Sequence, residues 1–177
     1  MIKKAIKEKI KEYFLLNPTE KLRVRHIEKV TKTTIPMAIR YSKELEEEEI
    51  LKKLTIANVT IYCANRSSKH FLLEKKLFNI KSLHKSELIK FLINELGNPS
   101  IIVFGSYSKG EDIENSDIDL YIQTPSKKEI NLEKFEKKLQ RKIQLFVYKD
   151  ITNIKNKELT NNIINGILLN GFVRVFK

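Results

Sequence analysis

Two aspartates separated by a single residue, Asp117 and Asp119, are the side chains of this sequence best suited to hold a metal ion. They stand in an alternating polar and apolar stretch, residues 116–122, that predicts a β-strand. Side chains at positions i and i+2 of a strand point to the same face, so both carboxylates project together. Mg²⁺ is normally held by one or two carboxylates together with substrate phosphates. We therefore expect Asp117 and Asp119 to bind Mg²⁺, or Mn²⁺ in its place.

A glycine-containing loop precedes this strand. The apolar run Ile101–Phe104 predicts a buried strand and leads directly into Gly105-Ser106 and then Gly110. At such a strand-to-helix turn, free backbone N–H groups and the helix dipole favour a phosphate. Gly105 lets a ligand approach the backbone closely, and the Ser106 hydroxyl can donate to a phosphate oxygen. Lys109 can either reach a triphosphate or lie in solvent. The phosphate-binding loop and the two metal-binding aspartates are expected to form one site.

The order Gly105-Ser106, Gly110, Ser116-Asp117-Ile118-Asp119-Leu120 resembles the signature of nucleotidyltransferases of the DNA polymerase β superfamily. In its compact spacing, this motif resembles that of the minimal nucleotidyltransferase group. The resemblance covers residues 82–177. It implies a mixed sheet flanked by helices and the transfer of a nucleoside monophosphate from an NTP, with ATP as the expected donor, to a hydroxyl. It also implies that Asp117 and Asp119 are catalytic and hold two Mg²⁺, while the triphosphate is held by Gly105, Ser106, Lys109 and Gly110.

A third carboxylate completes the site in the active members that this sequence resembles. The matching strand is Arg141–Tyr148, after a helix at Leu132–Leu139, and its inward position is Gln144. A glutamine can ligate a metal through its amide oxygen, but it cannot accept a proton. Asp150, just beyond the strand, is the nearby carboxylate that could substitute, and Asp112 lies either near the metals or in an ordinary loop. Two interpretations stay open: a transferase weakened at the third position, or a catalytically degenerate nucleotide-binding regulator that binds DNA.

The amino-terminal third of the sequence predicts a small helical unit. Apolar spacing predicts helices over residues 2–16, 24–30 and from Ile35 onward, followed by β-like runs at 50–56 and 59–64. This order is typical of a winged helix-turn-helix. The stretch from Leu22 to Glu46 also resembles the helix-turn-helix of small archaeal and bacterial regulators.

The third of these helices carries the expected DNA contacts. Ile27 and Val30 of the preceding helix are expected to face the core, as are four residues of this one: Ile35, Ala38, Ile39 and Leu45. The opposite face is expected to present Met37, Arg40, Tyr41 and Lys43 to DNA. The acidic run Glu46–Glu49 would repel phosphate, so a role in dimerisation or protein docking stays open.

The chain is therefore expected to be an α+β protein in three segments. These are a winged helix-turn-helix at residues 1–66, a helical connector at 67–81 and the nucleotidyltransferase-like part at 82–177. Within the last segment we expect a helix at 82–96, a helix at 159–169 and a closing strand at 172–176. The Asn165-Gly166 pair favours a turn, but the flanking isoleucines have helical spacing.

Composition limits the partners and the compartment. The 177 residues carry a net charge of +12, which residues 1–66 and 67–177 share equally at +6 each and which favours a polyanionic partner. Cys63 is the only cysteine, which excludes a disulfide framework and a cysteine-based zinc site. No apolar run reaches the ~18 residues of a membrane span, and the start does not resemble a signal peptide, so a cytoplasmic protein is expected.

The expected partners are an NTP and DNA, while a homodimer and a protein acceptor stay open. Lys127-Lys128 and Lys137-Lys138 are expected to be solvated or to guide a nucleic acid.

Overall fold

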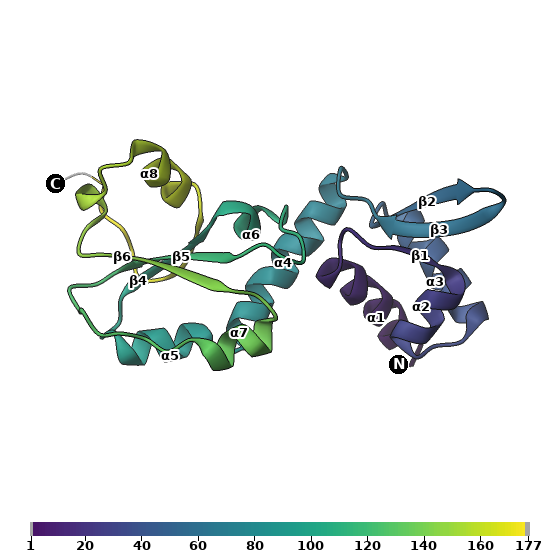
Figure 1. Cartoon of the computed structure of the whole chain (residues 1–177), viewed down its shortest axis with the longest axis horizontal. Helices are drawn as coiled ribbons and strands as arrows, with labels where there is room; N and C mark the ends of the chain where they lie inside the picture. Colours follow the sequence, from purple (N-terminus) through teal and green to yellow (C-terminus); the bar gives the residue numbers. More distant parts are fainter. Residues whose placement is uncertain (1, 176–177) are drawn as a thin grey trace. The chain divides into compact units, whose positions relative to one another are not determined.

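The computed structural model describes residues 2–175 and divides the chain into two compact units. The first unit extends to Phe78 and the second begins at Asn79. The boundary lies within helix α4 (Lys69–Lys85), which continues past the point where the sequence predicts the connector to end. Figure 1 shows the elements of both units.

The first unit consists of helices and one small antiparallel sheet. Its elements are α1 (Ile2–Leu16), β1 (Lys21–Arg23), α2 (Val24–Thr31), α3 (Ile35–Glu47), β2 (Leu51–Ile56) and β3 (Val59–Ala64). The strands lie in the order β1-β3-β2, and both pairings are antiparallel. Ala57 and Asn58 join β2 to β3 with φ angles of 47° and 64°, the left-handed backbone that suits a tight hairpin turn. The arrangement is consistent with a winged helix.

Helix α3 turns a different face to the core from the one predicted. Tyr41 is only 4% exposed and packs in the core with Ala38 and Leu45, whereas Ile35 and Ile39 are 38% and 50% exposed. The buried positions are Ala38, Tyr41, Ser42 and Leu45, which follow the i, i+3, i+4, i+7 spacing of one helical stripe. The predicted stripe began with the same spacing but at Ile35 instead of Ala38, so the expectation that Tyr41 faces DNA and that Ile35 and Ile39 are buried is wrong.

The prediction for helix α2 is wrong at one position. Ile27 is buried as predicted, but Val30 is 43% exposed. The buried partner of Ile27 is Thr31, one turn further along, and its hydroxyl donates to the Ile27 carbonyl at 2.6 Å. This hydrogen bond lets a polar residue occupy the buried face of the helix.

The second unit contains a mixed sheet flanked by helices. Its elements are α5 (Leu88–Glu95), β4 (Ser100–Phe104), α6 (Gly105–Lys109), β5 (Ile118–Gln123), α7 (Glu133–Leu139), β6 (Ile143–Tyr148), the 3₁₀ turn η1 (Ile151–Asn153), α8 (Lys157–Ile164) and β7 (Ile167–Asn170). The strand order is β6-β5-β4-β7, with β5 and β6 parallel and the other two pairs antiparallel. The prediction of an α+β fold with a mixed sheet in this part of the chain is confirmed.

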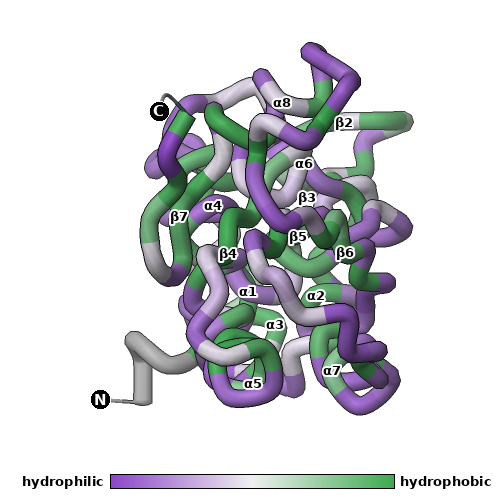
Figure 2. Tube along the Cα trace, turned by 90° about the vertical axis from the view of Figure 1, so that its left-hand side faces the viewer, coloured by the Kyte–Doolittle hydropathy of each residue, from purple (hydrophilic) through white to green (hydrophobic). Residues whose placement is uncertain are grey.

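The two faces of this sheet carry different side chains. On one face Ile118, Leu120 and Ile122 of β5 join the core that α5 and α7 cover. On the other face Tyr121 packs near α8. Figure 1 shows α5 and α7 on one side of the sheet and α8 on the other, and Figure 2 shows hydrophilic residues along α7. Asp119 and Tyr121 are two positions apart in β5, so their side chains lie on the same face of the sheet.

The carboxyl-terminal elements differ from the prediction. Helix α8 ends at Ile164, and residues 167–169, predicted as the end of the helix at 159–169, belong to β7, which pairs with β4. A Cβ on Gly166 would lie 2.5 Å from the Val103 carbonyl oxygen, so the turn into β7 passes directly against β4 at a glycine. The helical spacing of the isoleucines did not reveal this turn. Residues 171–175 form no strand, and Phe176 lies outside the described residues.

None of the helices among residues 2–175 is long and apolar enough to cross a membrane.

Candidate active site

Gly105 and Asp119 lie in direct contact where β4 ends and β5 begins. Gly105 follows β4 with a φ of +69°, and a Cβ at this position would lie 2.7 Å from Oδ2 of Asp119. A residue with a side chain would be strained by that backbone angle and would collide with the carboxylate. The pairing of Phe104 with Asp119 across β4 and β5 produces this contact. The structure thus brings together one residue from each half of the sequence motif.

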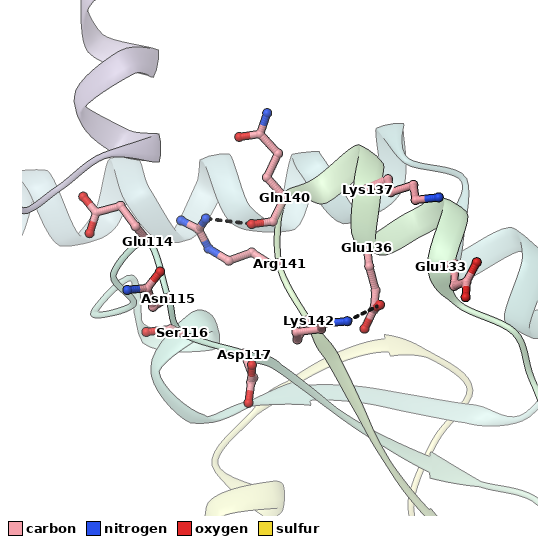
Figure 3. A pocket seen from close by; sticks show the side chains of 10 residues that line it. All are labelled: Glu114, Asn115, Ser116, Asp117, Glu133, Glu136, Lys137, Gln140, Arg141 and Lys142. Atoms are coloured by element: carbon pink, nitrogen blue, oxygen red, sulfur yellow. Dashed lines mark hydrogen bonds and ion pairs between the residues drawn. The ribbon is translucent and has the colours of Figure 1, made fainter.

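The carboxylate of Asp119 is influenced by its surroundings and by Asp117. Burial raises the pKa of Asp119 above its ordinary value, and the negative charge of Asp117 raises it further. Asp117 is exposed just before β5, and Figure 3 shows its carboxylate pointing away from α7. A half-buried carboxylate beside a second one is destabilised by charge repulsion, which a cation would relieve.

Gln144 lies beside Asp119 on the neighbouring strand. The parallel pairing of β5 with β6 sets Asp119 directly opposite Gln144, and directly opposite residues of neighbouring strands face the same side. Gln144 is exposed, so its amide oxygen is accessible. Within residues 2–175 there is no group of three or more His, Cys, Asp or Glu side chains that could hold a metal. The position expected for a third acid is therefore next to the aspartates but carries an amide.

Asp150 stabilises the turn that follows β6 through hydrogen bonds of its side chain. Its Oδ1 accepts hydrogen bonds from the backbone N–H of Thr152 at 2.8 Å and from the Thr152 hydroxyl at 2.7 Å, which caps η1. Its negative charge helps to raise the pKa of Tyr121, after burial as the main cause. Asp150 thus acts beside Tyr121, two residues further along β5 than Asp119.

The predicted triphosphate residues lie at the two ends of α6. Gly105 and Ser106 begin this helix next to Asp119, while Lys109 and Gly110 stand at its other end. Gly110 has a φ of +77°, and its N–H bonds to the Ser106 carbonyl to end the helix. Lys109 is exposed. The hydroxyl of Ser108, a residue that the sequence analysis did not single out, donates to the Gly105 carbonyl at 2.8 Å and so braces the turn.

A buried hydrogen-bond pair supports the loop between α6 and β5. Asn79 Nδ2 donates to the Tyr107 carbonyl at 2.9 Å and to Asp112 Oδ1 at 2.6 Å. Asn79 and Asp112 are each only 1% exposed. Asp112 is therefore a buried anchor of the loop that leads to Asp117. Asn79 lies 28 and 33 residues from its partners, so no local pattern could have revealed its role.

A cavity of about 570 Å³ opens beside Asp117, between α7, the loop before β5 and the start of β6 (Figure 3). Glu136 and Lys142 face each other in it at 3.1 Å, and Glu136 Oε1 also accepts the backbone N–H of Ile143 at 3.0 Å. These contacts, the Ile143 hydrogen bond foremost, hold the pKa of Glu136 below its ordinary value. Because Asp117 lines this cavity, the cavity is a candidate binding site for part of the substrate.

The predicted DNA contacts of α3 have different surroundings. Arg40 is exposed and pairs with Glu44 at 2.9 Å, and exposed Lys43 lies 4.0 Å from Glu47. Met37 is half-buried against the core, and Tyr41 is buried. Arg40 and Lys43 are therefore the two predicted contacts that lie at the surface.

Comparison with known proteins agrees with this geometry. Residues 85–168 match the family model of the nucleotidyltransferase domain, a range that includes the motif from Gly105 to Asp119 and the strand with Gln144. Neither the curated proteins nor the solved structures gave a match to this chain.

Proposed function

We propose that the polymerase-β-like nucleotidyltransferase domain at residues 85–168 transfers a nucleoside monophosphate from an NTP, ATP in the first instance, to a hydroxyl acceptor. The observation that carries the proposal is the contact of Gly105 with Asp119, with Gln144 opposite and Asp117 two residues before. A phosphate-binding turn and a pair of carboxylates are the two parts that such a transfer requires.

The residues present fit a divalent cation. Two carboxylates and an amide oxygen are hard oxygen donors, which Mg²⁺ and Mn²⁺ prefer. The negative charge of Asp117 contributes to the raised pKa of Asp119, and a cation would offset that repulsion. Mg²⁺, when bound, would stabilise the negative charge on the transferred phosphoryl group. Because Gln144 is neutral, the second of two ions would be held more weakly than by three carboxylates.

The residues of the chain have separate tasks in this proposal. The Gly105 backbone and the Ser106 hydroxyl orient the triphosphate, and Asp117 and Asp119 hold the cation. The acceptor oxygen bonds to the α-phosphorus while the bond to the bridging oxygen breaks and pyrophosphate leaves. Gln144 cannot take up the acceptor proton. We therefore expect slow transfer, with the proton lost to water or to a carboxylate.

Label transfer tests this function. The full chain is incubated with Mg²⁺ or Mn²⁺, each α-labelled NTP, and DNA, RNA or protein acceptors. We expect label on an acceptor with the wild type and none with Asp117→Asn/Asp119→Asn. Gln144→Asp should raise the rate at least about tenfold, because it restores a base and a charged ligand. Absence of label with both the wild type and Gln144→Asp would contradict the proposal.

A second candidate function is a catalytically degenerate regulator that binds a nucleotide and DNA. Gln144 favours it, because an amide at the third position impairs catalysis before it impairs binding. The first unit adds support, since we propose that it is a winged helix that binds DNA through Arg40 and Lys43. Under this function, NTP binds without transfer and changes the affinity for DNA. A DNA affinity that NTP does not change would exclude it.

A further inference from the structure

Two isoleucines of α3, Ile35 and Ile39, lie at the surface of the first unit, although the sequence predicts them in the core. We propose that these two side chains contact the methyl groups of thymine in the major groove of duplex DNA, so that the first unit prefers sites rich in A·T pairs. The inference rests on the second candidate function for DNA binding itself. It adds the chemical feature of the base pairs that α3 recognises.

The two isoleucines form an apolar surface on the first two turns of α3. They are four residues apart, so they lie one turn from each other on the same side of the helix. The buried stripe of this helix begins at Ala38 and lies on another side. The amino-terminal residues of a recognition helix are the ones that contact base edges. Ile35 and Ile39 therefore lie where such a helix recognises the bases.

The charge around these isoleucines suits a polyanion. Residues 21–43 contain seven Lys or Arg and a single acidic residue, Glu28. All seven basic side chains are exposed. An apolar protein surface that covered the isoleucines would cover such cations without a counter-charge, whereas phosphates line both sides of a major groove. Charge complementarity therefore favours duplex DNA as the partner of this surface.

The acidic residues of α3 lie at its other end. Five of the six residues at 44–49 are glutamates. Lys7 of α1 pairs with Glu44 at 3.5 Å and with Glu48 at 2.5 Å, so part of this charge is already neutralised within the first unit. The remaining glutamates would repel phosphates. Only the first half of α3, which carries Ile35 and Ile39, is therefore suited to enter a groove.

The side chains at this end of α3 limit the bases that it can recognise. Asn and Gln form bidentate hydrogen bonds to adenine, and Asp and Glu accept from cytosine. Residues 32–43 contain none of these four residue types. Apolar side chains instead contact the methyl group of thymine, which projects into the major groove. Ile35 and Ile39 are suited to that contact, while Arg40 and Lys43 would bind the phosphates beside it.

Removal of the thymine methyl groups tests the contact on the full chain. The probes are a fluorescein-labelled 20-base-pair duplex of A·T pairs and the same duplex with uracil in place of every thymine, followed by anisotropy at fixed salt. We expect the wild type to bind the uracil duplex at least about fivefold more weakly, because the methyl contacts are lost. Ile35→Ala/Ile39→Ala should bind both duplexes equally, at the lower affinity.

A second pair of exposed residues provides the matched control. Leu73 and Leu77 of α4 have the same spacing and are 54% and 56% exposed. Leu73→Ala/Leu77→Ala removes a similar apolar area and should keep the preference of the wild type for thymine. Both double variants replace exposed helical residues by alanine, a strong helix former, so circular dichroism should show an unchanged fold. An effect of uracil on the shape of the duplex would persist in the isoleucine variant, so the difference between that variant and the wild type measures the direct contact.

The possible outcomes separate this inference from the function on which it rests. Equal affinity of the wild type for the two duplexes would overturn the methyl contacts, as would a preference for thymine that the isoleucine variant retains. DNA binding through Arg40 and Lys43 would stand in both cases. Binding of neither duplex would contradict DNA binding and this inference together. A wild-type dimer that Ile35→Ala/Ile39→Ala converts to a monomer, with uracil and thymine bound equally, would instead assign the isoleucines to a contact between two copies of the chain.

Discussion

Asp119 is half-buried against Gly105, near the negative charge of Asp117, and both burial and that charge raise its pKa in the folded protein. A carboxyl group whose pKa is raised by folding favours the folded state when it is protonated, and this contribution is lost as the pH rises through the raised pKa. The charged side chain therefore lowers stability at neutral pH. This is the expected cost of a site arranged for a cation.

Asp119→Asn should consequently stabilise the protein in the absence of divalent cations. We expect the Tm at pH 7.5 in a chelating buffer to rise by about 1–3 °C, because the substitution removes a half-buried charge that Asp117 repels. The gain should shrink as the pH falls toward the ordinary range of aspartate, where the wild type is protonated. Thermal unfolding across this pH range is the measurement.

Addition of Mg²⁺ provides the control for that experiment. The wild type should gain in Tm, because a ligand that binds only the folded state stabilises it, and Asp119→Asn should gain much less. A variant that is less stable than the wild type in the chelating buffer would show that Asp119 has no repulsion to relieve.

Gly105→Ala tests the close approach at the turn. The added Cβ would lie 2.7 Å from Asp119 Oδ2 at a φ of +69°, so the carboxylate or the turn must move. We expect a loss of about 1–2 kcal/mol of unfolding free energy, measured with urea, and loss of label transfer. Gly97→Ala is the matched control, since its φ is +69° but its Cβ would meet nothing within 4 Å. Equal activity in the two variants would contradict a role for the Gly105 contact.

At the scale of elements, the packing of α4 against the loop after α6 depends on Asn79. Asn79→Ala removes donors to the Tyr107 carbonyl and to buried Asp112. We expect a loss of about 1–3 kcal/mol in urea unfolding, because Asp112 stays buried with one donor fewer. Asn94→Ala, on the exposed side of α5, should change stability by less than about 0.5 kcal/mol. Similar losses in the two variants would show that the buried hydrogen bonds contribute little.

The elements also show how far the sequence allowed prediction. Strand β4, which begins at Ser100, was predictable because the short apolar run Ile101–Phe104 marks a buried strand. The strand that begins at Ile143 was predicted within Arg141–Tyr148 from the family resemblance. Gly105 and Asp119 were predictable as partners because their motif is local. The buried face of α3 was not, because Tyr41 and Ser42 give no stronger apolar signal than exposed Ile39. Strand β7 was missed because the residues that it pairs with in β4 lie 64 to 69 positions earlier in the sequence, and tertiary pairing overrides helical spacing.

At the scale of the whole molecule, the net charge of +12 is distributed over both halves of the sequence, at +6 each for residues 1–66 and 67–177. A basic chain attracts nucleic acid without regard to sequence, and each neutralised phosphate releases counterions. Salt dependence can therefore separate a localised contact from the general field. The exposed pair Arg40 and Lys43 of α3 offers the sharpest case, because each already faces a carboxylate, of Glu44 and Glu47, that a phosphate would replace.

Arg40→Ala/Lys43→Ala should weaken binding to duplex DNA about tenfold near physiological salt. The slope of log K against log salt should decrease by about two, because two phosphate contacts are lost. Lys9→Ala/Lys69→Ala removes the same charge from exposed positions outside α3 and should leave the slope nearly unchanged. Anisotropy titrations between about 50 and 200 mM salt give both quantities. If the two double variants lose affinity equally, the binding reflects the overall charge and α3 does not contact DNA; a slope that falls only in the α3 variant assigns the DNA contact to that helix.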